Sequence, residues 1–199
     1  MRVSSGSRGE TQKPERRVSR RRLFELTAAA ALTLGGLAAA VRTHGYAVPV
    51  GRRLVATSPW QFIVLQHAAR RIAAPDREGA AAIPTVPTAD DLDVAGFVDG
   101  WLVRMQPGVR RDFGRFLAYV EHVAPLREGL VTRFSRLAPP EQDRVLAATE
   151  ASSSDLLRAG FDGLKSLCMM GYYRDARAWS LVGYDGPLVG RPPSGWSGG

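Results

Sequence analysis

The chain has 199 residues, of which 45% are hydrophobic and 23% charged, and its net charge is +8. This composition is that of one ordinary globular domain behind a basic leader. Residues 1–22 hold eight of the 27 Lys and Arg residues but only two of the 19 acidic ones, so the rest of the chain is nearly neutral. A nearly neutral body lacks the basic face that phosphate binding requires, which argues against a nucleic-acid partner.

The leader is followed by a motif typical of export through the twin-arginine route. Residues 1–18 contain almost no apolar side chains and are predicted to be disordered. Residues 19–41 are predicted to be a twin-arginine signal with its apolar segment. The motif residues are Ser19, Arg20, Arg21, Arg22, Leu23 and Phe24. The alternative is a basic tail that leads into an alanine-rich core helix.

The apolar run at 26–41 is rich in alanine and shorter than the roughly 20 apolar residues that span a bilayer. A run this short and mild suits a signal that carries folded proteins, although its retention as an anchor stays open. No clean small-x-small cleavage site follows the run, and the two candidate positions are Ala38-Ala39-Ala40 and Gly45-Tyr46-Ala47. Residues 42–57 show little periodicity and are predicted to be a linker.

Residues 58–170 are predicted to form a small all-α bundle of about five helices, because apolar residues recur at three and four positions without a strand pattern. The first helix begins after Ser58, with Pro59 and Gln61 completing its cap, and stops before Pro75. Cys168 is the only cysteine, so no intrachain disulfide and no thiolate cluster can form. We expect Cys168 to be a small buried hydrophobic residue.

The second helix is predicted to begin at Thr88, with Asp91 as its capping partner and Asp90 and Asp93 beside the positive end of the helix dipole. Its expected buried stripe is Val94, Phe97, Val98, Trp101, Leu102 and Met105.

The third helix is predicted to begin at Val109, after a break at Pro107-Gly108, and Pro125 is expected to end or kink it near Leu126. Its expected buried stripe is Phe113, Phe116, Leu117, Val120 and Val123.

The fourth helix is predicted to follow Ala138-Pro139-Pro140-Glu141, and the fifth to follow the serine run 152–154. Leu156, Leu157, Phe161, Leu164, Leu167 and Cys168 make the expected buried stripe of the fifth helix.

The chain offers no convincing catalytic group. His44, His67 and His122 are widely spaced and no nucleophile motif accompanies them. Glu121 is the neighbour of His122, but adjacent helical positions point about 100° apart. We therefore expect no catalytic, metal-binding or cofactor-binding residue in this chain. An autonomous exported enzyme would need His67 and His122 to meet a carboxylate in one pocket.

Residues 171–190 form an aromatic segment rich in turn-forming residues, and residues 191–199 are predicted to be a flexible tail. Tyrosine and tryptophan are enriched at subunit interfaces, so this segment is the predicted partner interface. Its residues are Tyr172, Tyr173, Asp175, Trp179, Tyr184, Asp185, Gly186 and Pro187. The alternative is a tail that folds over the chain's own bundle, and one segment can do both.

The order Gly-Tyr-Tyr, Asp175, Trp179, Gly-Tyr-Asp-Gly-Pro resembles the gluconate 2-dehydrogenase subunit 3 family, the small subunit of exported flavin-dependent sugar and alcohol dehydrogenases. The stretch from Phe134 to Leu146 resembles the start of a helix in that family. The likeness covers most of Trp60 to Pro187, whereas the front extension and the helix between Ser58 and Ala74 lie outside the recognised pattern.

The resemblance implies a non-catalytic subunit without a cofactor of its own. Its partner would be an FAD-dependent catalytic subunit of the glucose–methanol–choline (GMC) oxidoreductase type, which takes up FAD in the cytoplasm. This chain would assist that maturation and bring the signal that the twin-arginine translocase reads. The complex would act in the periplasm or at the periplasmic face of the inner membrane, with a cytochrome c as electron acceptor. The alternative is a stand-alone membrane-associated or periplasmic helical scaffold without an enzymatic partner.

Overall fold

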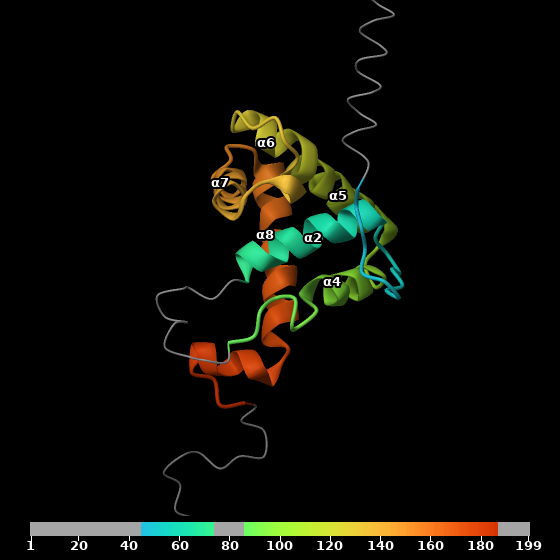
Figure 1. The fold of residues 1–199 in the computed structure, drawn as a ribbon, viewed down its shortest axis with the longest axis vertical. Helices are drawn as coiled ribbons and strands as arrows, with labels where there is room; N and C mark the ends of the chain where they lie inside the picture. The colour runs from blue at the N-terminus through green and yellow to red at the C-terminus, as the bar shows by residue number, and fades with distance from the viewer. Residues whose placement is uncertain (1–44, 74–85, 187–199) are drawn as a thin grey trace, which may run out of the picture. The chain divides into compact units, whose positions relative to one another are not determined.

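The computed structural model describes residues 45–73 and 86–186, which form helices joined by turns (Figure 1). The predicted leader at 1–18, the export signal and apolar run at 19–41 and the tail at 191–199 lie outside these residues. The described part is all-α, as predicted, and contains no strand. No helix within it is long and apolar enough to cross a membrane.

The longest helix of the described residues is α8 (Asp155–Tyr173), which contacts α2, α4, α5 and α7 and appears in orange behind α2 in Figure 1. The other helices are α2 (Pro59–Ile72), α4 (Val94–Leu102), α5 (Pro107–Ala118), the π-helix η1 (Tyr119–Val123), α6 (Ala124–Arg127), the 3-10 helix η2 (Phe134–Arg136), α7 (Pro139–Glu150) and the 3-10 helix η3 (Ala176–Val182).

The core lies where these helices pack on α8. Buried side chains of α8 recur at three and four positions: Phe161, Leu164, Leu167, Cys168 and Tyr172. Burying one leucine or phenylalanine contributes about 1.5–3 kcal/mol relative to its exposure. Cys168 is fully buried, and burial raises the pKa of its thiol to about 12. The predicted role of Cys168 as a buried hydrophobic residue is confirmed.

The start of α2 confirms the predicted cap. The side-chain oxygen of Gln61 accepts a hydrogen bond from the backbone N–H of Ser58 at 2.9 Å and another from its hydroxyl at 3.0 Å. Pro59 is the first residue of the helix, where its missing N–H costs nothing. The helix ends at Ile72, before Pro75 as expected.

The second helix begins later than predicted. Thr88 and Asp91 do exchange the hydrogen bonds of a capping box, but they close a turn rather than a helix. Asp93 has a φ of 47°, a left-handed conformation that separates this turn from α4. Asp90 and Asp93, predicted to lie at the positive end of the helix dipole, instead form ion pairs with Arg70 and Arg52, respectively. α4 ends at Leu102, so Met105 of the expected stripe lies beyond it.

The third helix begins earlier than predicted and ends close to the predicted residue. Pro107 does not break the chain but is the first residue of α5. The π-helix η1 and then α6 continue α5 to Arg127, one residue past the predicted end near Leu126. The wider turn of a π-helix shifts the residues after it around the axis. Val123, predicted to be buried, is accordingly 45% exposed.

The start of α7 after Ala138 confirms the prediction, while the fifth helix extends further than expected. α8 continues past residue 170, so the first residues of the aromatic segment form its last turn. Leu156 is 80% exposed, so its predicted place in the buried stripe is wrong. The neighbouring Leu157 packs against the core instead.

Residues 45–57, predicted to be a linker, are bound to the bundle by two buried carboxylates. Asp99 is 3% exposed and accepts hydrogen bonds from the backbone N–H groups of Val55 (2.8 Å), Ala56 (3.1 Å) and Thr57 (2.7 Å) and from the Thr57 hydroxyl (2.6 Å).

Glu121 is the second carboxylate and is fully buried. It accepts a hydrogen bond from the Tyr46 hydroxyl at 2.8 Å, and Ser135 donates to it from its backbone N–H (2.9 Å) and its hydroxyl (2.6 Å). Arg133 lies 3.5 Å from the same carboxylate and stacks 3.9 Å above the Tyr46 ring. Because both carboxylates need donors in the interior, this segment is part of the fold.

Candidate partner interface

The aromatic segment turns sharply where α8 gives way to η3. The Asp175 carboxylate accepts from the backbone N–H of Arg177 at 3.0 Å and caps η3. The Arg177 guanidinium also donates to it, through Nε and Nη2, each at 2.9 Å. These bonds lower the pKa of Asp175 to about 2, the Arg177 side chain being the largest cause. Asp175 therefore fixes the direction of the chain after α8.

Tyr172 points into the bundle and is only 2% exposed. Its hydroxyl donates to the carbonyl oxygen of Pro87 at 2.7 Å, and burial raises its pKa. Its ring meets that of Tyr173 edge-on, with the ring centres 5.3 Å apart. The predicted interface residue Tyr172 thus follows the alternative, in which the segment packs on the chain's own bundle.

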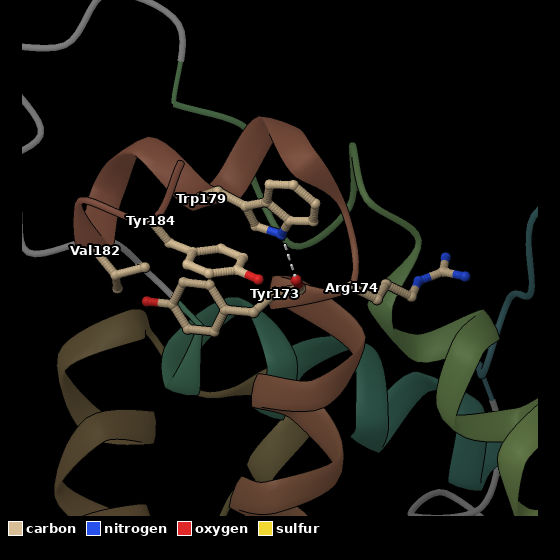
Figure 2. A pocket seen from close by; sticks show the side chains of 5 residues that line it. All are labelled: Tyr173, Arg174, Trp179, Val182 and Tyr184. Atoms are coloured by element: carbon tan, nitrogen blue, oxygen red, sulfur yellow. Dashed lines mark hydrogen bonds between the residues drawn. The ribbon is translucent and has the colours of Figure 1, made fainter. Parts of the chain in front are cut away.

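The other aromatic residues gather around a surface pocket of about 330 Å³ lined by Tyr173, Arg174, Trp179, Val182 and Tyr184 (Figure 2). The Trp179 indole donates to the carbonyl oxygen of Tyr173 at 2.8 Å, the bond drawn in Figure 2. The rings of Trp179 and Tyr184 pack edge-on, 5.1 Å apart. Val182 is 58% exposed and Tyr184 44% exposed. The result is a cluster of ordered rings with an open apolar edge.

Arg174 lines the pocket but points away from the rings in Figure 2, toward α4. Its guanidinium donates to the carbonyl oxygen of Leu92 at 3.1 Å and stacks on Phe97 at 4.9 Å. Gly186 is buried behind the cluster with a φ of 104°, and an added Cβ would lie 3.1 Å from the Trp179 ring. Asp185 is exposed, and Pro187 lies outside the described residues.

A larger apolar groove, which the sequence analysis missed, runs between α5 and α8 and has a volume of about 790 Å³. Its floor on α8 consists of four small residues and four larger ones: Leu156, Leu157, Ala159, Gly160, Gly163, Ser166, Leu167 and Met170. The signal was present in the sequence, because these positions recur at three and four residues on the side of α8 that carries Leu156.

Two glycines of the groove serve different purposes. A Cβ on Gly160 would collide with the Phe116 ring, so Gly160 allows α5 to pack against α8. A Cβ on Gly163 would have no heavy atom within 4 Å, so this position is open space. Gly163 is therefore not required by the packing of the described residues, and it leaves the floor of the groove low.

The two described histidines are not brought together. His67 lies beside Gln142, with its Nδ1 3.0 Å from the amide nitrogen, and burial followed by the charge of Arg70 lowers its pKa. The His122 ring packs against Trp60, 6.3 Å between ring centres. The contacts lie seven residues apart on α2, about 10 Å along its axis. In the described part, no three His, Cys, Asp or Glu residues are grouped so that they could hold a metal ion.

Comparison with known proteins gives one result. The family model described as gluconate 2-dehydrogenase subunit 3 matches residues 61–186. The match begins in the first turn of α2, so the helix that sequence analysis placed outside the family pattern lies inside it. No curated protein and no solved structure matches the chain.

Proposed function

Because the chain belongs to the gluconate 2-dehydrogenase subunit 3 family, we propose that it is the non-catalytic small subunit of an exported dehydrogenase complex. The catalytic partner in this proposal is an FAD-dependent subunit of the GMC type that oxidises a sugar or an alcohol. The small subunit binds it in the cytoplasm, assists its maturation and supplies the twin-arginine signal for both. The complex then works in the periplasm or at the periplasmic face of the inner membrane, and a cytochrome c accepts its electrons.

The observation that carries the proposal is the extent of the family match. Residues 61–186 include nearly all of α2 and every described element after it, through to the aromatic segment. The family is therefore assigned on the whole folded body and not on one short motif. A dehydrogenase subunit that is numbered third in its family name implies other subunits, which supports the partner in the proposal.

The aromatic segment supports a role in contacting that partner. Tyr173, Trp179 and Tyr184 are fixed by their own ring contacts and by the indole hydrogen bond, so little conformational entropy remains to be lost on binding. Rigid aromatic side chains with an exposed apolar edge are the usual anchors of protein interfaces. The segment thus packs on its own bundle through Tyr172 and still offers a surface through Val182 and Tyr184.

Purification of the tagged full-length chain from its native host tests the proposal. We expect a yellow eluate with flavin absorption bands and a second, larger polypeptide. Replacing Arg20, Arg21 and Arg22 by lysine should leave both chains in the cytoplasmic fraction. A colourless eluate with a single chain would contradict the proposal and favour the stand-alone scaffold.

A further inference from the structure

The groove between α5 and α8 has the length and the exposed apolar surface of a binding site. Val109 is 52% exposed, Leu156 80% and Met170 42%, although all three line the groove. Leu156 and Met170 are 14 residues apart, which is about 21 Å along the α8 axis. That length accommodates about four turns of a second helix.

The floor of the groove allows a helix to approach closely. Between Leu156 and Met170 the lining residues of α8 are the small residues Ala159, Gly160, Gly163 and Ser166, together with Leu157 and Leu167, which both pack against the core. The distance between packed helix axes depends on the side chains at the contact, and small side chains give the shorter distances. Gly163 has open space above it. A helix in the groove would therefore contact the backbone of α8 at its centre and the larger side chains at its ends.

One rim of the groove is basic. Arg115 lines the groove and also lines a shallow pocket on the other side of α5, together with Arg110 and Arg111. Arg111 does not line the groove but lies one helical turn before Arg115, so the two form a ridge beside it. Asp112 also lines the groove and pairs with Arg115 at 2.8 Å, whereas no ion pair of the described residues includes Arg110 or Arg111. Asp162 is exposed on α8 and does not line the groove.

We propose that this groove binds an amphipathic helix of the catalytic partner. The apolar face of that helix lies on Leu156, Gly163 and Met170, and its acidic flank faces the ridge of Arg111 and Arg115. The inference rests on the proposed function, because it assigns the surface that the partner subunit contacts. A helix lying in an apolar groove is a common mode of recognition, and carboxylates are the natural partners of an arginine ridge.

The charge of the chain's own remaining segments does not fit this rim. Residues 187–199 contain one arginine and no acidic residue. Residues 1–22 carry eight basic and two acidic residues. Residues 23–44 contain one acidic residue, Glu25, and residues 74–85 contain two, Asp76 and Glu78, in a stretch of eight residues between Pro75 and Pro84. None of these segments supplies a four-turn helix with an acidic flank, which leaves a helix from another chain as the occupant that complements the ridge.

Photo-crosslinking identifies the occupant directly. A benzophenone amino acid replaces Leu156 in the tagged full-length chain, and the same amino acid replaces the fully exposed Val50 as a control. After irradiation in the native host, we expect the Leu156 position to crosslink to a peptide of the flavoprotein. That peptide should have apolar residues at three and four positions and Asp or Glu on one flank. A crosslink to a second copy of this chain, to residues 187–199 or to a peptide without acidic residues would overturn the proposal.

A matched pair of glycine variants measures the contribution of the groove. Gly163→Leu fills the groove, while Gly100→Leu adds the same side chain to open space on α4, outside the groove. We expect Gly163→Leu to lower the flavoprotein recovered per chain about tenfold or more, and Gly100→Leu to change it less than about twofold. Thermal unfolding of both variants shows that they fold. Equal recovery from both would overturn the groove as the contact.

A charge reversal tests the ridge in the same assay. Arg111→Glu should weaken recovery and reduce its dependence on salt, whereas Arg53→Glu, an exposed arginine outside α5 and outside the groove, should change neither. If the wild-type chain recovers no flavoprotein, the proposed function fails. If wild type and the groove variants recover it equally, only the groove inference fails.

Discussion

Tyr46→Phe removes one oxygen atom and tests whether the segment before α2 belongs to the folded unit. The lost hydroxyl donates to Glu121, which is fully buried, at 2.8 Å. Burial and this hydrogen bond raise the pKa of Tyr46, so the tyrosine stays a neutral donor at any pH used. A hydrogen bond to a charged group contributes about 1.5–3 kcal/mol. Ser135 continues to donate two bonds, so we expect a loss of about 2 kcal/mol.

Urea unfolding of the purified full-length chain measures this loss. For a domain of this size, 2 kcal/mol corresponds to a drop in Tm of about 4–8 °C. Tyr172→Phe breaks a neutral hydrogen bond to the carbonyl oxygen of Pro87 and should cost about 1 kcal/mol. Tyr184→Phe, in a side chain that is 44% exposed, should change stability by less than about 0.5 kcal/mol. If Tyr46→Phe unfolds at the same urea concentration as Tyr184→Phe, the bond to Glu121 does not hold the segment.

Three further predictions follow from burial and charge. Leu164→Ala should destabilise the fold by about 2–5 kcal/mol in urea, because Leu164 is fully buried, whereas Leu156→Ala should change it by less than about 0.5 kcal/mol. Burial raises the pKa of Asp99, but hydrogen bonds, led by that of the Thr57 hydroxyl, lower it below 3.8 overall. The Asp99 carboxylate therefore stabilises the fold above its pKa in the unfolded chain, and this stabilisation is lost as the pH falls through its pKa in the folded chain. The free energy of unfolding of Asp99→Asn should accordingly fall less on acidification than that of the wild type. Cys168 should react with a thiol reagent at pH 8 only after urea is added, and rapid labelling of the native chain would contradict its burial.

The features that could be predicted from the sequence are those set by neighbouring residues. Ser58, Pro59 and Gln61 act within one helical turn, and their pattern located the start of α2. The apolar spacing of α8 likewise identified Phe161, Leu164 and Leu167 as core residues. A local pattern can also be correct without marking the start of a helix. Thr88 and Asp91 form the hydrogen bonds of a capping box, but these bonds close a turn before α4.

The features that could not be predicted depend on residues far apart in the chain. Tyr46 and Glu121 are separated by 75 residues, and neither pattern nor spacing shows that one will donate to the other. The sequence analysis considered Glu121 only as the neighbour of His122, whereas the structure places it fully buried in the π-helix η1. The candidate interface likewise has a part that could be predicted and a part that could not. The composition of the sequence identifies the aromatic segment, whereas the burial of Tyr172 and the exposure of Leu156 depend on how the helices pack.

The two cleavage positions in the sequence differ in their consequence for the fold. A cut after Ala47 would separate Tyr46 from the bundle and remove a donor from Glu121, a buried carboxylate whose other donors are fixed in place. Removing one partner of a buried charge costs several times more than losing a surface contact. Ala38-Ala39-Ala40 precedes Gly45, so a cut there leaves the bond intact. If the leader is removed, we therefore expect the exported chain to begin before Gly45, and its intact mass decides between the two positions.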